Sequence, residues 1–196
     1  MSQPLSTTEI CNLALDYLNE VPLMSYDSDT SSVAQWFRRN FWQTAWGIIR
    51  RHPWNFASKR VQFTSAGTAP AFGWTYAYDL PADVLRVLPL TDDGTDNGNP
   101  VPFKVEGNQI LTDWPAPLNM RYLWRVNNTG AFDTSFVDVL SAALAQRIAH
   151  WLTGKQSMAQ LMGQTAAALM TEAQGMDALE GQADEPIDGD WIAWRQ

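Results

Sequence analysis

The chain has 196 residues, of which 45% are hydrophobic, and its 13 basic and 21 acidic side chains give a net charge of −8. This length suits one domain, or one domain with an insertion, and the acidic balance argues against tight, sequence-independent binding of nucleic acid, which needs Lys and Arg. The sequence has no run of about 18 consecutive apolar residues, so no membrane-spanning helix is expected. Its first residues lack a basic segment followed by an apolar one, so no secretory signal is expected. The single cysteine, Cys11, excludes an intramolecular disulfide and suits folding in a reducing cytoplasm.

The first two predicted elements are helices. The first begins near Thr7, with Ser6 or Thr7 as its N-cap, and continues until Pro22 ends it. The second spans about Ser32 to Arg51, and its apolar residues exceed what a one-sided surface helix requires. The surplus forms a second stripe, which lies either in the core or at a subunit interface: Trp42, Trp46 and Ile49.

The hydrophobic period changes to that of strands between Lys59 and Val126. β-Branched and aromatic residues predict short strands at 60–63, 74–78 and 120–126. A hairpin is expected to turn at Gly107-Asn108. The segment 91–100, TDDGTDNGNP, is too hydrophilic to bury and is predicted as a loop.

Helical spacing returns after Asp133, a plausible N-cap, and Gly154 closes this third helix. A fourth helix starts at Ser157 and is rich in Ala and Gly, which permit close approach of another helix. Seven acidic residues and no basic one lie between Glu172 and Asp190, and the chain after Gly181 is expected to be extended.

This order predicts an α+β fold in which an antiparallel helical bundle carries a β-rich insertion between its second and third helices. The bundle is assigned to residues 1–52 and 131–180, and the insertion to 53–130. An extended C-terminal arm is assigned to 181–196.

The stretch from Arg50 to Arg60, RRHPWNFASKR, combines four basic residues with two large aromatic ones. Pro53 cannot continue a helix, and Arg50 and Arg51 then fall in a last helical turn, where cations interact favourably with the helix dipole. The stretch is therefore interpreted as the joint between helix and sheet. A phosphate-binding patch is the alternative.

No catalytic, cofactor-binding or metal-binding group is predicted. Cys11, His52 and His150 belong to three separate elements and lack the spacing of metal motifs. Asp79 and Asp83 bracket a Pro-containing turn, where Asp commonly fixes the backbone, although paired carboxylates for glycoside cleavage are the sharper alternative.

Two groups of aromatic residues are candidates for binding. Trp74, Tyr76 and Tyr78 share one face of a predicted strand, as core residues do, or form a stacking platform for sugars or bases. The end of the chain is acidic yet holds tryptophans, which gain little unless they are buried. These terminal residues either pack back on their own subunit or dock in a partner: Trp191, Ile192, Trp194 and Arg195.

Five segments, in this order, resemble the tail tubular protein A family, the head-to-tail adaptors of short-tailed bacteriophages. They are TEICNLALDYL, RRHPWNFASKRVQF, WTYAYDLPADVLRVLPL, VEGNQILTD and FDTSFVDVLSAALAQRIAHWLT, and the resemblance covers roughly Thr8 to Leu179. Residues 92–100 and the tail after Gly181 match nothing in the family's pattern.

The resemblance implies a structural virion protein, made in the bacterial host cytoplasm and located in the neck of the virus. It implies a ring, usually of twelve copies, that joins the portal protein to the tail nozzle and lets DNA pass during ejection. It also implies that the C-terminal segment clasps the portal, which favours Trp191, Ile192, Trp194 and Arg195 as portal-binding residues and the stripe Trp42, Trp46 and Ile49 as a possible subunit interface.

Acidic side chains facing such a channel would repel the DNA backbone and ease its passage. Two rival functions remain at this stage, a carbohydrate-binding tail component and a small hydrolase that uses Asp79 or Asp83.

Overall fold

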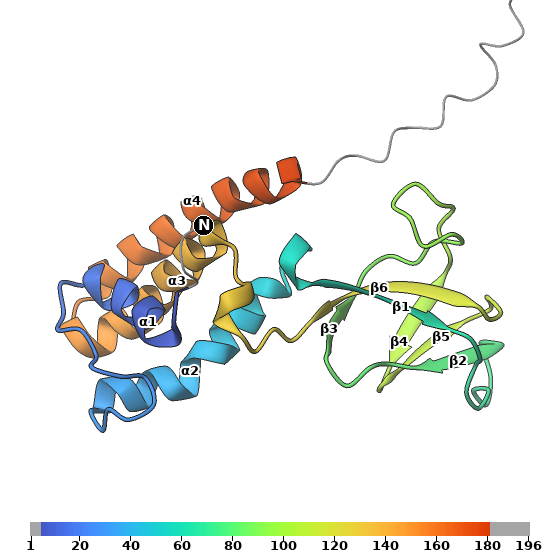
Figure 1. The fold of residues 1–196 in the computed structure, drawn as a ribbon, viewed down its shortest axis with the longest axis horizontal. Helices are drawn as coiled ribbons and strands as arrows, with labels where there is room; N and C mark the ends of the chain where they lie inside the picture. The colour runs from blue at the N-terminus through green and yellow to red at the C-terminus, as the bar shows by residue number, and fades with distance from the viewer. Residues whose placement is uncertain (1–4, 181–196) are drawn as a thin grey trace, which may run out of the picture. The chain divides into compact units, whose positions relative to one another are not determined.

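The computed structural model describes residues 5–180 and divides into two compact units (Figure 1). The first unit combines the residues up to Ser58 with Leu123–Leu179 and holds four α-helices, and the second is built on Lys59–Tyr122. The expectation of a mixed chain with its strands between the second and third helices is confirmed. The limits expected for the insertion, 53 and 130, lie a few residues outside the limits of the second unit.

The first two helices start where the sequence predicts. Ser6 caps α1 in a capping box with Glu9, and Ser31 caps α2. The expected extension of the first helix to Pro22 is wrong, because Asn19 adopts a left-handed φ of 55° and turns the chain. The bounds are α1, Thr7–Asp16, and α2, Ser32–Ile49.

The last two helices follow each other almost directly. Asp133 caps the third helix, and Gly154, with φ of 66°, ends it in the left-handed conformation that glycine tolerates best. Trp151, in the last turn of this helix, is 52% exposed. The bounds are α3, Thr134–Thr153, and α4, Gln156–Glu180.

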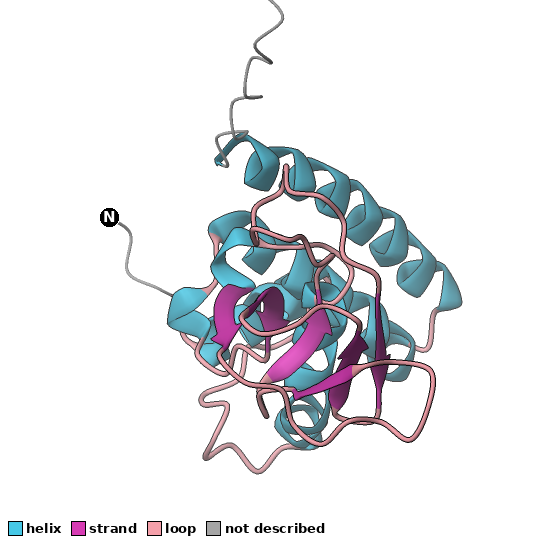
Figure 2. Cartoon of the chain, turned by 90° about the vertical axis from the view of Figure 1, so that its right-hand side faces the viewer, coloured by secondary structure: helices cyan, strands magenta, loops and turns pink. Residues whose placement is uncertain are grey.

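Six short strands, magenta in Figure 2, belong to two three-stranded antiparallel sheets. The strand orders are β1-β6-β3 and β2-β5-β4. The predicted hairpin at Gly107-Asn108 is confirmed as the turn between β4 and β5. Trp74 precedes β2 rather than lying within it, and no sequence pattern predicted β3. The bounds are β1, Ser58–Phe63; β2, Tyr76–Asp79; β3, Val84–Val87; β4, Phe103–Glu106; β5, Gln109–Thr112; and β6, Leu118–Trp124.

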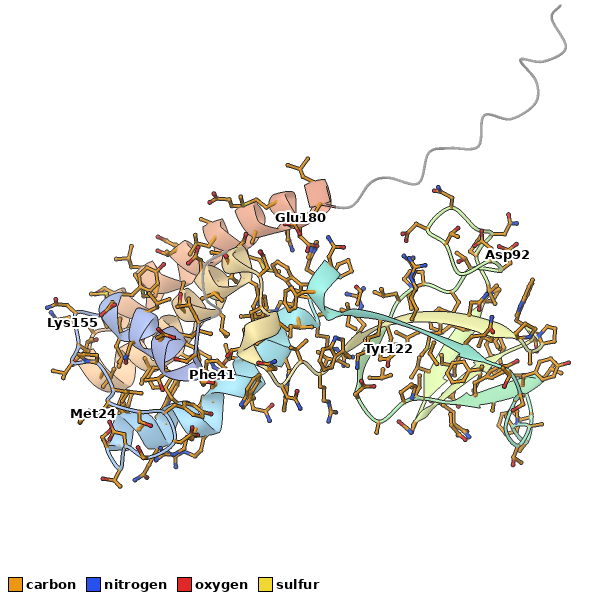
Figure 3. All side chains as sticks on the ribbon, viewed as in Figure 1. Met24, Phe41, Asp92, Tyr122, Lys155 and Glu180 are labelled. Carbon is orange, nitrogen blue, oxygen red and sulfur yellow. The ribbon has the colours of Figure 1, made fainter. Side chains whose placement is uncertain are left out.

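The core of the helical unit lies where α1 and α2 pack on α3. Phe41, labelled in Figure 3, is fully buried among them. Ile49 is also fully buried, so this member of the predicted second stripe belongs to the core and cannot serve a subunit interface. Burial of side chains of this size contributes about 1.5–3 kcal/mol each.

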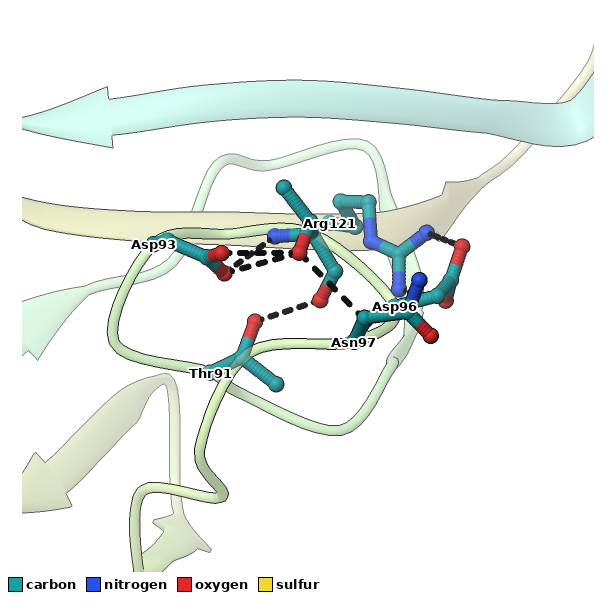
Figure 4. A network of polar contacts seen from close by, with 6 residues as sticks. Thr91, Asp93, Asp96, Asn97 and Arg121 are labelled. Atoms are coloured by element: carbon teal, nitrogen blue, oxygen red, sulfur yellow. Dashed lines mark hydrogen bonds and ion pairs between the residues drawn. The ribbon is translucent and has the colours of Figure 1, made fainter. Parts of the chain in front are cut away.

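A polar network fixes the predicted loop at 91–100 within the second unit (Figure 4). Asp93 accepts hydrogen bonds from the backbone and hydroxyl of Thr95, and the Thr91 hydroxyl donates to the Thr95 carbonyl at 2.7 Å. Asp96 forms an ion pair with Arg121 of β6, and this pair lowers the pKa of Asp96 from its usual value. The loop is therefore ordered by side-chain hydrogen bonds rather than by a core.

Within residues 5–180, no helix combines the length and the apolar character needed to cross a bilayer.

Candidate interaction surfaces

The stretch RRHPWNFASKR joins the end of α2 to β1, as predicted. Helix α2 ends at Ile49, a short 3₁₀ turn covers Asn55–Ala57, and β1 follows directly. Trp54 is fully buried and packs edge-on against Phe136 of α3, with ring centroids 5.2 Å apart. The joint is thus fixed to the helical core by an aromatic anchor.

Asp177 of α4 provides the polar part of the same anchor, and sequence reasoning missed it. One carboxylate oxygen lies 2.9 Å from Nε2 of His52, and the other accepts the Asn55 backbone N–H at 3.0 Å. The Asn55 side chain also donates to the Asp177 carbonyl at 2.8 Å. Asp177 is only 8% exposed, so its hydrogen bonds compensate the cost of burying a charge. The role of His52 is therefore structural.

Trp42 and Trp46 form a stacked pair on one flank of α2, with ring centroids 6.1 Å apart. The Trp46 indole donates to the Val126 carbonyl at 2.9 Å, and the Arg125 guanidinium lies 5.8 Å from the centre of its ring. Phe132 flanks Trp42 at 6.2 Å. Both tryptophans are half-buried, so each one leaves part of its ring available to a partner.

The outer face of α4 is a second candidate surface. Only three of its 25 residues, Met162, Ala173 and Asp177, are buried. Leu161 and Met176 are each 53% exposed, and Leu179 is 87% exposed. Leu161 and Leu179 stand 18 residues apart, which is five turns of about 3.6 residues, so they occupy the same angular position on the helix. Leu161 lies near the start of α4, whereas Met176 and Leu179 lie near its end, and the positions between them on this side of the helix are Thr165, Ala168 and the exposed Glu172. The three exposed apolar residues Leu161, Met176 and Leu179 are called the α4 stripe, and Lys155 and Glu180 mark the two ends of the helix in Figure 3.

The two surfaces lie on different sides of the helical unit. Gln43 and Gly47 of α2, together with Arg51 just after the helix, share a groove with the start of α4. Trp42 and Trp46 lie about 100° around α2 from Gln43 and Gly47, because each residue advances the helix by that angle. The tryptophan flank therefore turns away from α4.

The other candidate residues from the sequence belong to neither surface. Cys11 is fully buried, and burial raises the pKa of its thiol well above the usual value. His150 is exposed in the last turn of α3. Among the described residues, no group of three or more His, Cys, Asp or Glu side chains is placed to hold a metal ion. Trp191, Ile192, Trp194 and Arg195, together with the whole predicted arm at 181–196, lie outside the described residues.

The two carboxylates of the hydrolase alternative are engaged in structural contacts. Asp79 accepts a hydrogen bond from Gln109 at 2.8 Å. Asp83 accepts hydrogen bonds from Lys59 at 2.7 Å and from the Tyr122 hydroxyl at 3.1 Å. The Lys59 contact is the main cause of a lowered pKa for Asp83. A general acid for glycoside cleavage needs a raised pKa, so Asp83 lacks the property that this role requires.

The second unit also has an aromatic hollow of about 240 Å³. Phe72, 87% exposed, and Trp74 line it together with Lys104 and Glu106, whose side chains form an ion pair at 2.5 Å. Tyr78 does not contribute, because it is buried and its hydroxyl donates to the Trp114 carbonyl. The predicted aromatic stripe is thus divided between the core and the surface.

In comparisons with known proteins, the sequence matches no family model and no curated protein.

Proposed function

We propose that this chain is a structural head-to-tail adaptor of a bacteriophage virion, in which identical copies form a ring that joins the portal to the tail and leaves a channel for DNA. The family resemblance of the sequence supports a ring of twelve built on an antiparallel helical bundle. The finer expectations, a C-terminal arm that clasps the portal and a location in the virion neck, belong to the same proposal.

The observation that carries the proposal is the outer face of α4. Single exposed apolar residues are normal on protein surfaces, but α4 exposes three on one side, of which Met176 and Leu179 lie within one turn of each other. Burial of each of these side chains against a neighbour would contribute roughly 1.5–3 kcal/mol. Burial of these side chains would require a partner, because helices α1 to α3 of this chain leave them exposed.

A ring needs two different patches on each subunit, which meet head to tail. The stripe on α4 supplies one patch, and the stacked Trp42–Trp46 pair supplies the other. Tryptophan and arginine are enriched at the centres of interfaces, and Arg125 lies beside Trp46. Because the two patches lie on different sides of the helical unit, copies that meet through them head to tail form a ring when the rotation between neighbours closes, and the portal supplies a template for that closure.

An acidic ring suits the passage of DNA. Cationic groups that neutralise phosphates would hold the duplex, whereas acidic groups within about 8–10 Å of it repel the backbone at ordinary salt. We therefore expect the purified protein to bind DNA negligibly at physiological salt. A tight, salt-sensitive complex in a gel-shift assay would contradict this expectation.

Electron microscopy of the full chain mixed with its cognate portal ring tests the proposal. We expect an added ring of density on the portal, and we expect a variant that lacks Trp191–Gln196 to stay folded but to join the portal no longer. Undiminished joining by this variant would refute the clasp, and the absence of any ring with the intact chain would refute the adaptor.

Carbohydrate binding is the second candidate, because Phe72 and Trp74 line a hollow beside charged side chains. Sugar rings stack on aromatic faces, and charged groups can bond their hydroxyls. A glycan array, followed by tryptophan fluorescence with any sugar that binds, separates this function from the adaptor. Replacement of Trp74 by Ala should abolish the signal if the hollow is a sugar site.

A further inference from the structure

A groove of about 520 Å³ lies between α2 and the start of α4, and α3 also lines it. It holds two arginines, Arg51 and Arg147, and no acidic side chain of the described residues lines it. Within residues 5–180, neither arginine has a carboxylate at ion-pair distance, and Arg147 donates a hydrogen bond to the Thr44 hydroxyl at 2.5 Å. The groove is also lined by four side-chain amides, those of Gln43, Gln146, Gln156 and Gln160.

Gly47 indicates that the groove admits another segment of chain. It lies inside α2, where glycine is less favourable than alanine by about 1 kcal/mol. A Cβ placed on Gly47 would meet nothing within 4 Å, so packing among the described residues does not require a glycine there. A peptide backbone that passes close to α2 at this point would account for it.

The donors in the groove fit carboxylates. Guanidinium groups bind carboxylates through two parallel hydrogen bonds, and glutamine amides add further donors. Two cations are too few for duplex DNA, since proteins that bind it tightly neutralise roughly 6–10 phosphates. The groove is also short, because the eight residues from Gln43 to Arg51 advance the chain by about 12 Å. A short acidic peptide matches both the charge and the length.

The chain contains such a peptide in the segment 184–188, DEPID, which has three carboxylates and no basic residue. Four extended steps, from Asp184 to Asp188, span about 13 Å, close to the length of the groove. Pro186 disfavours helical geometry at Glu185, so the sequence of this segment suits an extended path.

The end of α4 brings the segment within reach of the groove of its own subunit. Arg51 is followed by His52, whose Nε2 lies 2.9 Å from a carboxylate oxygen of Asp177, so the arginine end of the groove lies beside the last turn of α4. The four residues after Glu180 can cover about 13 Å, which brings Asp184 to Arg51. The next four residues can then follow the groove along α2.

The covalent tether favours this segment over the same segment of another copy. A segment on a short flexible linker has an effective concentration in the millimolar range. Another copy of the chain competes equally only when the protein itself is millimolar. At micromolar protein, the tethered segment therefore has an advantage of roughly a thousandfold.

We propose that the acidic segment 184–188 docks in the groove of its own subunit, where Arg51 and Arg147 bind its carboxylates. The inference deepens the proposed adaptor function, on which it rests for the role of the C-terminal arm. Docking fixes the base of the arm on the helical unit, and it leaves the residues from Trp191 onward free to reach the portal.

Cross-linking of the full-length chain, at micromolar concentration and low salt, tests the proposal. The variant Gln160→Cys, Ile187→Cys places one thiol in the groove and one in the segment, while the native Cys11 is fully buried. With a short bismaleimide we expect both new thiols to be joined within one chain, which mass spectrometry shows as a bridged monomer. A bridged dimer would assign the groove to a second copy, and the absence of any bridge would also overturn the proposal.

Charge reversal separates docking from random encounters of a tethered thiol. The added changes Arg51→Glu, Arg147→Glu should lower the yield of the bridge by at least about fivefold, and Glu185→Lys, Asp188→Lys in the same chain should restore it. An unchanged yield in the first of these variants would contradict the proposal.

Glu172 provides the matched control for the position of the thiol. It is exposed, it is closer to Ile187 in the sequence than Gln160 is, and it lies about 120° around α4 from Gln160. The variant Glu172→Cys, Ile187→Cys should therefore give less bridge than the groove variant, and a higher yield from it would show that the segment lies elsewhere.

Peptide competition gives a second readout that needs no engineered thiol. A fluorescein-labelled peptide of residues 182–190 should bind the wild type weakly, because the protein's own segment occupies the groove. The full-length variant Asp184→Asn, Glu185→Gln, Asp188→Asn should bind the peptide at least about tenfold more tightly in fluorescence anisotropy. Equal binding by the two proteins would overturn the proposal.

Steric closure of the groove checks where the peptide binds. Gly47→Gln, added to the neutralised variant, should remove the gain in affinity, because the new side chain occupies the groove. Gly175→Gln is the matched control, since Gly175 is also a helical glycine whose added Cβ meets nothing within 4 Å but does not line the groove. Circular dichroism should show that both variants remain folded, and equal effects of the two changes would contradict the assigned site.

Nucleic acid is the remaining occupant that the experiment distinguishes. A DNA duplex that displaces the peptide from the neutralised variant, and loses affinity on charge reversal of Arg51 and Arg147, would identify a nucleic-acid site and overturn the proposal. None of these results decides ring formation on the portal, which electron microscopy tests separately.

Discussion

Helices α3 and α4 are neighbours in the chain, yet they relate to the protein in opposite ways. Ten of the 20 residues of α3 are buried, whereas only three of the 25 residues of α4 are. Helices α1 and α2 both pack on α3, while the stripe of Leu161, Met176 and Leu179 on α4 stays uncovered. Under the proposed function, α3 is covered by helices of its own chain and the exposed side of α4 is covered by a neighbouring copy.

The largest expected effect comes from a cavity in α3. Leu140→Ala should lower the free energy of unfolding by about 2–5 kcal/mol, because the side chain is fully buried. Leu161→Ala on α4 makes the same chemical change at a site that is 53% exposed, and it should change the stability by no more than about 0.5 kcal/mol. Urea denaturation, monitored by tryptophan fluorescence, measures the free energy of unfolding of both variants. Equal losses of this free energy would contradict the contrast between α3 and α4.

The next effect concerns the polar anchor of α4. Asp177→Ala should cost about 1–3 kcal/mol, because the Asn55 backbone N–H and the His52 ring lose their carboxylate partner. Glu172→Ala, one and a half turns away and exposed, is the matched control and should have little effect. If the two variants unfold at the same urea concentration, Asp177 does not fix the joint to α4.

The smallest effect is expected where α3 faces an acidic residue of α4. Burial, with Asp133 and Glu172 nearby, raises the pKa of Asp138 above its usual value of 3.8. A carboxyl whose pKa is raised by folding stabilises the protein fully below the unfolded pKa, and this contribution is lost as the pH rises through the folded pKa. Asp138→Asn removes that loss of stability. The melting temperature of the variant should therefore be slightly higher than that of the wild type at about pH 7, and the two melting temperatures should agree at about pH 4. A gap that grows on acidification would show that the sign is wrong.

Local signals were sufficient to predict most helix limits from sequence. Ser31, Asp133 and Gly154 cap helices through bonds and φ angles that depend on nearby residues alone. The strand β3 could not be predicted in this way, because its four residues lie between Pro81 and Pro89 and are paired only through the distant β6. Pairing of this kind is decided by tertiary structure.

The candidate surfaces were predictable only in part. The apolar stripe on α2 was correctly recognised as surplus, but its division into a buried Ile49 and two half-buried tryptophans depends on how α2 packs. Asp177 was counted among the acidic residues near the C-terminus, and its partners lie more than 120 residues earlier in the chain. The groove between α2 and the start of α4 is lined by residues from three helices and by Arg51 after α2, so no spacing in the sequence shows it.

The most direct test of the account is whether the stripe on α4 is needed for assembly. The double variant Leu161→Asp, Leu179→Asp should stay as stable as the wild type but should form no ring on the cognate portal in electron micrographs. The variant Ala167→Asp, Thr171→Asp adds the same charges about 80–120° around the helix and should still assemble. Intact rings from the stripe variant would contradict the claim that a second copy covers α4.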